Sequence, residues 1–165
     1  MESGKQPEQL QDAGEGGIET YLKRFGTFTY RFSGVSMLPL LRQNRDDFTV
    51  RAVRHDEIPA KGDVVLFKDE LGRYVLHRVI RVDETTVTTR GDNCRKADKP
   101  IDSSWILGIM TGYTRNGHEH NVTDTGYRLY SAVIRCSTPI RLAYKNIRRL
   151  AGMALRKVKH GVKGA

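Results

Sequence analysis

Hydrophobic and polar side chains alternate over residues 27–32, where Phe28, Tyr30 and Phe32 share one face of an extended chain. This period of two is typical of a half-buried β-strand. Further short runs of apolar and β-branched residues follow, separated by turns that contain glycine or aspartate. These runs predict strands over residues 48–53, 64–67, 74–82, 85–89 and 106–113. Short strands at this spacing predict a mainly β domain.

A helix is expected near the C-terminal end of the sequence. Ser137 or Thr138 is suited to cap it and Pro139 to open it, and apolar residues recur beyond them at helical spacing. Basic residues fall on a different face of the same segment. The sequence therefore predicts a basic amphipathic helix that is joined to the β domain.

The length of 165 residues fits one domain with two tails. Residues 1–17 are polar and are expected to form a disordered tail. Residues 18–136 are expected to form the β domain, which starts with a short helix that Gly26 ends. Residues 137–165 complete the chain as the basic helix and its tail.

The net charge of +9 is concentrated in the last segment, because residues 141–165 hold eight Lys or Arg and no acidic residue. The rest of the chain is nearly neutral, so nucleic acid is not an expected partner of the β domain. Two interpretations of the helix remain open. It packs on the β domain with its basic face in water, or residues 140–163 make peripheral contact with an anionic membrane surface.

Neither a membrane-spanning segment nor a secretory signal is visible. The longest apolar stretches are residues 64–67 and 105–110, far short of the roughly 20 residues that a spanning helix needs. Residues 1–17 lack the charged and apolar regions of a signal peptide. A cytoplasmic protein is expected, with peripheral membrane contact as the alternative.

No cofactor and no metal site are expected. Cys94 and Cys136 are too few for a disulfide framework and are interpreted as free thiols, with Cys94 a spectator near the candidate site. His118 and His120 lie in a polar segment without further ligands, which favours a solvated turn.

Ser36 stands in a turn directly after the first strand, where free backbone N–H groups are suited to hold an oxyanion. A serine hydroxyl needs a base within about 2.6 to 3.2 Å to act as a nucleophile. His77 is the best candidate, because a histidine in the middle of an apolar strand is unusual for packing alone. Asp92 and Asp98 follow the next strand, and the residues alone leave open which of them orients the imidazole.

The order of these segments resembles that of signal peptidases and LexA-type self-cleaving repressors. The segment 33–39 resembles their nucleophile box, residues 61–67 their core strand, residues 74–79 their base box and residues 91–93 their glycine-aspartate-asparagine box. The resemblance implies a LexA- or signal-peptidase-like β fold, an extended peptide or protein substrate and small side chains near the cut.

Two details of the resemblance concern the candidate site. His77 stands where bacterial members have lysine, so the chain is similar to the endoplasmic-reticulum and archaeal type, in which a second acid lies six positions after the aspartate of the closing box. Asp98 has that spacing from Asp92 and is therefore the first choice as orienting acid, with Asp92 as the alternative or as a site-closing residue. Gly34 stands where signal peptidases carry a serine, so the oxyanion hole would consist of the backbone N–H groups of Val35 and Ser36.

The expected function is that of a serine endopeptidase that works through an acyl-enzyme on Ser36, with His77 as general base. One alternative is a self-cleaving regulator of the LexA type. A second alternative is a non-catalytic module whose basic helix docks on lipid or nucleic acid.

Overall fold

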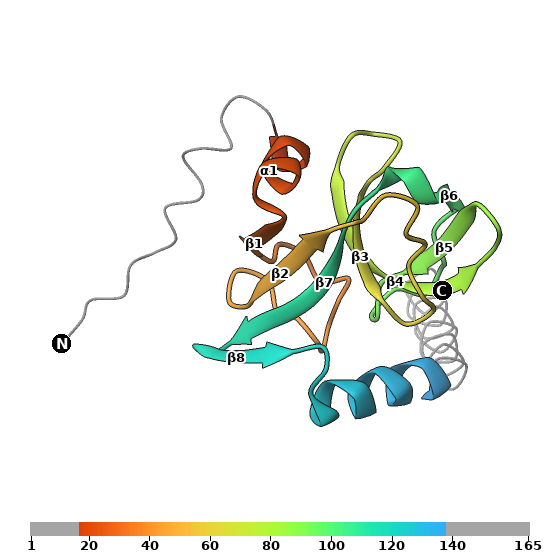
Figure 1. The fold of residues 1–165 in the computed structure, drawn as a ribbon. Helices are drawn as coiled ribbons and strands as arrows, with labels where there is room; N and C mark the ends of the chain where they lie inside the picture. The colour runs from red at the N-terminus through yellow and green to blue at the C-terminus, as the bar shows by residue number, and fades with distance from the viewer. Residues whose placement is uncertain (1–16, 138–165) are drawn as a thin grey trace, which may run out of the picture.

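The computed structural model describes residues 17–137 of the chain. Within this range one sheet of eight strands is accompanied by helices at both ends of the segment (Figure 1). Residues 125–137 form the second α-helix, called helix 125–137 below. The other elements are α1 (Gly17–Phe25), β1 (Thr27–Arg31), β2 (Asp47–Ala52), β3 (Val64–Lys68), β4 (Tyr74–Val82), β5 (Thr86–Arg90), β6 (Ile101–Asp102), the 3₁₀-helix η3 (Ser103–Trp105), β7 (Ile106–Arg115) and β8 (His118–Asn121).

All strand pairs of this sheet are antiparallel, and the main order is β1-β2-β7-β3-β4-β5-β6. The long strand β7 is central, because it pairs with β2 along one edge and with β3 and then β8 along the other. In Figure 1, α1 (red) lies near β1 and β2, and helix 125–137 (blue) follows β8 and lies far from α1. The sheet therefore carries one helix near its β1 edge and the other beyond β8.

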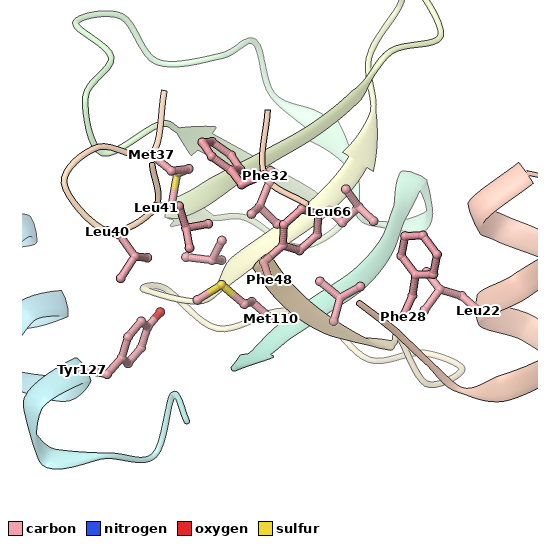
Figure 2. Packing of buried hydrophobic residues seen from close by; sticks show 13 residues of the cluster. Leu22, Phe28, Phe32, Met37, Leu40, Leu41, Phe48, Leu66, Met110 and Tyr127 are labelled. Atoms are coloured by element: carbon pink, nitrogen blue, oxygen red, sulfur yellow. The ribbon is translucent and has the colours of Figure 1, made fainter. Parts of the chain in front are cut away.

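The core consists of two apolar clusters, one on each face of β3. Val64 and Leu66 belong to the larger cluster, whereas Val65 and Phe67 belong to the smaller one. Successive side chains of a strand point to opposite faces, so this continuous apolar run is buried on both. Figure 2 shows the larger cluster, in which Tyr127 points from helix 125–137 toward Leu40 and Met110.

The predicted mainly β character is confirmed, and each strand expected from periodicity is present within one or two residues of its predicted bounds. The short first helix is also present and ends before Gly26, whose φ of 75° suits glycine. Phe28 and Phe32 are buried as expected. Tyr30 is 37% exposed, so the predicted apolar face of β1 is only partly covered.

Four elements were not predicted: β6, η3, β8 and helix 125–137. The expectation that Ser137 caps a helix is wrong, because Ser137 already lies inside one. The expectation of a solvated turn at His118 and His120 is also wrong. They lie on β8, which pairs with β7, and the turn itself is formed by Asn116 and Gly117, both at positive φ.

Most of the predicted basic helix lies outside the described residues, including residues 140–163, for which membrane contact was one of two interpretations. Most of the predicted N-terminal tail lies outside them as well. Among residues 17–137, no helix is long and apolar enough to cross a membrane.

Candidate active site

Ser36 lies in the turn of residues 33–39 that leaves β1, called the Ser36 turn below. Gly34 has a φ of 112°, a conformation that residues with a Cβ rarely adopt, and it reverses the chain just before Ser36. Met37 and Leu40 are fully buried in the larger core cluster and anchor the turn from beneath. The Ser36 side chain remains half-buried at the surface of the domain.

His77 is held by an aspartate from a distant part of the chain. The His77 Nδ1 atom lies 2.7 Å from the Asp98 Oδ2 atom. The same carboxylate oxygen accepts a hydrogen bond of 2.6 Å from the Thr89 hydroxyl, and the Asp98 N–H donates to the Thr89 carbonyl. Two hydrogen bonds thus fix Asp98 to β5, and Asp98 in turn fixes one ring nitrogen of His77.

The Asp98 carboxylate is kept ionised by these contacts. Its partial burial raises its pKa, but the hydrogen bonds from His77 and Thr89 outweigh the burial and leave the pKa below the usual value of 3.8. An ionised carboxylate favours the imidazole tautomer that carries its proton on Nδ1. The Nε2 atom of His77 is then the one that is able to accept a proton.

Gly91 brings the Ser36 turn and the His77 ring together. A Cβ atom at Gly91 would lie 2.7 Å from the Ser36 carbonyl oxygen, 2.9 Å from His77 Nε2 and 2.8 Å from the sulfur of Cys94. Three groups from different segments therefore surround one small volume that only glycine leaves open. His77 Nε2 and the backbone carbonyl of the candidate nucleophile therefore lie beside the same Gly91 position.

The turn of residues 91–94, called the closing turn below, also clamps the Ser36 turn directly. The Asn93 N–H donates to the Ser36 carbonyl at 2.7 Å, and the Asn93 side-chain amide donates to the Val35 carbonyl at 3.1 Å. Both acceptors are carbonyl groups, so the clamp leaves the neighbouring N–H groups untouched. Among the described residues, the N–H groups of Val35 and Ser36 donate to no other group. They are therefore available to an oxyanion.

Asp92 does not contact His77. Its two carboxylate oxygens accept hydrogen bonds of 2.8 Å from Nε and Nη2 of Arg78, and both side chains are only 1% exposed. Burial lowers the pKa of Arg78, but the hydrogen bonds and charge of Asp92 outweigh that effect and raise it. Of the two aspartates that the sequence left open, the structure pairs Asp98 with the imidazole and Asp92 with the neighbouring guanidinium.

Ser36 and His77 line the same groove, which has a volume of about 810 Å³. The groove is lined by residues 28–33 of β1 and the following turn and by residues 73–77 at the start of β4, with Gly17 and Ile18 of α1 also contributing. Most of the groove lining is apolar. Within residues 17–137, the Ser36 hydroxyl makes no side-chain hydrogen bond, to His77 or to another residue.

Arg78 and Thr89 belong to this site but were not singled out from the sequence, and Asn93 was named only as part of the closing box. Thr89 is fully buried, and its place on an alternating strand two residues before Gly91 is the signal that marks it. Compared with known proteins, the chain matches no protein-family model and no curated relative. Among the described residues, no group of three or more His, Cys, Asp or Glu is arranged to hold a metal ion.

Proposed function

We propose that this chain is a serine endopeptidase in which Ser36 is the nucleophile, His77 the general base and Asp98 the acid that orients His77. The observation that carries the proposal is the hydrogen bond between His77 Nδ1 and Asp98 Oδ2, with Nε2 of the same ring beside the Gly91 position that the Ser36 carbonyl also borders. The sequence resemblance to signal peptidases and LexA-type repressors supports the same assignment and a fold of that kind.

In the proposed reaction, His77 Nε2 takes the proton of the Ser36 hydroxyl while the oxygen attacks a substrate carbonyl carbon. The backbone N–H groups of Val35 and Ser36 receive the negative charge that develops on the carbonyl oxygen. His77 then gives its proton to the leaving amine, and an ester between Ser36 and the acyl part of the substrate remains.

Water completes the cycle in the second half of the reaction. His77 removes a proton from the water molecule that attacks the ester, and returns it to the Ser36 oxygen as the acid product leaves. Asp98 stays ionised throughout and stabilises the charged imidazole of both steps. Its lowered pKa supports this role at neutral pH.

The substrate is proposed to be an extended peptide. β1 pairs with β2 along one edge and has no second strand partner among the described residues, and residues 74–77 of β4 pair only with β3. Both edges belong to segments that line the groove. A chain in β-conformation that binds along either edge would gain backbone hydrogen bonds. Its side chains would meet apolar walls.

The test combines a fluorophosphonate probe with a library of peptide substrates, both applied to the full chain. Labelling and cleavage are expected in the wild type and in Ser103→Ala, a matched serine change in η3 outside the groove lining. Both activities should be lost in Ser36→Ala. Labelling of Ser36→Ala equal to wild type, or no labelling and no cleavage by either protein, would contradict the proposal and favour a binding module.

A further inference from the structure

Helix 125–137 makes polar contacts with the site through the buried pair of Arg78 and Asp92. The Tyr130 hydroxyl donates a hydrogen bond of 2.9 Å to Asp92 Oδ2, the oxygen that also accepts from Arg78. Arg78 Nη1 donates to the Ser131 hydroxyl at 3.0 Å and to the Tyr127 hydroxyl at 3.3 Å. The helix therefore supplies polar partners to both members of the pair.

The rings of the same helix also cover the guanidinium group. The Cζ atom of Arg78 lies 5.8 Å from the ring centroid of Tyr127 and 5.8 Å from that of Tyr130. An ion pair that is 1% exposed is stable only when its remaining donors and acceptors are satisfied. Helix 125–137 fulfils that condition, so the position of Asp92 depends on it.

Asp92 lies between the two residues of the closing turn that touch the Ser36 turn. Gly91 precedes it and lies against His77 Nε2 and the Ser36 carbonyl, and Asn93 follows it and donates to that carbonyl. A displacement of Asp92 moves both neighbours, because they share its peptide bonds. The closing turn, which contacts His77 and the Ser36 carbonyl, is thus connected to the helix through Asp92.

We propose that helix 125–137 positions the candidate active site, chiefly through Tyr130, which holds Asp92 and with it the closing turn against the Ser36 turn. Tyr130 is a positioning residue: it lies outside the groove lining and acts through Asp92. The kinetic part of this proposal rests on the proposed peptidase function, whereas the coupling between Tyr130 and the closing turn does not.

The test is Tyr130→Phe in the full chain, which removes the hydroxyl and keeps the ring over Arg78. The first readout is amide exchange of Asn93, whose N–H donates to Ser36, measured against Phe32, whose N–H donates to the Asp46 carbonyl. Exchange at Asn93 is expected to become about 10-fold faster, the size expected when a hydrogen bond to a charged acceptor is lost, and exchange at Phe32 is expected to stay unchanged.

The second readout is peptide cleavage per folded molecule. We expect kcat to fall about 10-fold while KM changes less than about twofold, because Tyr130 and Asp92 do not line the groove. Tyr21→Phe removes a hydroxyl from α1 and should change neither readout. Tyr127→Phe, which loses only the longer bond to Arg78, should have an intermediate effect.

Unchanged Asn93 exchange and unchanged kcat in a folded Tyr130→Phe protein would overturn the proposal. If that variant does not fold, Ser131→Ala removes another bond from the same helix to Arg78 and must accelerate Asn93 exchange; if it does not, the proposal is equally overturned. If Asn93 exchange is faster in Tyr130→Phe but the wild type cleaves no peptide, the coupling is established and the peptidase assignment is refuted.

Discussion

The Asp98 and His77 side chains meet at 2.7 Å although the two residues are 21 positions apart in the chain. The meeting depends on β5, because the backbone of Thr89 accepts from the Asp98 N–H and its hydroxyl donates to the carboxylate. Asp92 lies closer to His77 in sequence but is bound to Arg78 on the other side of β4. Successive residues of a strand face opposite sides, so His77 and Arg78 select different aspartates.

Ser36, His77 and Asp98 are expected to act as one unit. Ser36→Ala and His77→Ala should each reduce kcat/KM by roughly 10⁴-fold or more, and the double variant should lose about as much as either single variant. Asp98→Asn should cost about 10²- to 10⁴-fold, because the imidazole loses the acceptor that fixes its tautomer. Steady-state kinetics on one peptide measures all four proteins. Losses that multiply in the double variant would show that Ser36 and His77 work independently.

The Asp98 contacts should also appear in the stability of the fold. The pKa of Asp98 is lower in the folded chain than the usual 3.8, so its ionised form stabilises the fold above that pH and the contribution is lost as the pH falls through the folded-state value. Urea unfolding of wild type and Asp98→Asn at several pH values measures the difference. We expect the wild-type advantage to be present at neutral pH and to shrink below 3.8. A difference that is independent of pH would mean that the Asp98 charge contributes nothing.

Gly91→Ala should impair the site more than the rest of the fold. The added methyl group would lie within 3 Å of Ser36, His77 and Cys94 atoms, so the closing turn must shift. Overpacking of this kind costs about 1 to 3 kcal/mol, and we expect kcat to fall at least about 10-fold. Gly126→Ala is the matched control, because its Cβ would meet nothing within 4 Å. Equal kinetics in the two variants would contradict the arrangement around Gly91.

The Cys94 side chain should be dispensable for catalysis, but chemical modification of its thiol should inhibit the enzyme. Its half-buried sulfur lies beside the same Gly91 position as His77 Nε2, so a bulky adduct on it would fill the space next to the imidazole. A maleimide should inhibit the wild type and Cys136→Ala, and should leave Cys94→Ala active. Loss of activity in untreated Cys94→Ala would instead assign the thiol a direct role.

The strands of this fold were predictable because their burial follows a local period. β1, β3 and β4 each show alternation or a continuous apolar run that depends only on neighbouring residues. β6 has two residues and β8 has four polar ones, so neither carries a period long enough to detect. Both strands exist because a neighbouring strand supplies their hydrogen bonds.

Helix 125–137 was missed for a different reason. Leu129 and Val133 are exposed, whereas the buried positions are Tyr127, Ser131 and Ile134. Because two of these three buried residues are a tyrosine and a serine, the helical spacing is not apparent when only aliphatic residues are considered. Their hydroxyl groups face inward and accept hydrogen bonds from Arg78. A contact between residues so far apart in the chain cannot be predicted from the local sequence.

The groove is bordered by two strand edges whose backbone groups have no strand partner among the described residues. An edge of this kind accepts any extended chain, and the groups that would align a substrate are equally open to a strand from another molecule. Natural sheets reduce this hazard with charged side chains, and here Arg31 and Arg73 lie on the two borders, paired with Asp47 and Asp69. High salt would screen the repulsion that such surface charges provide. The same opening that admits a peptide thus makes the concentrated protein prone to associate with itself, most of all when those charges are screened.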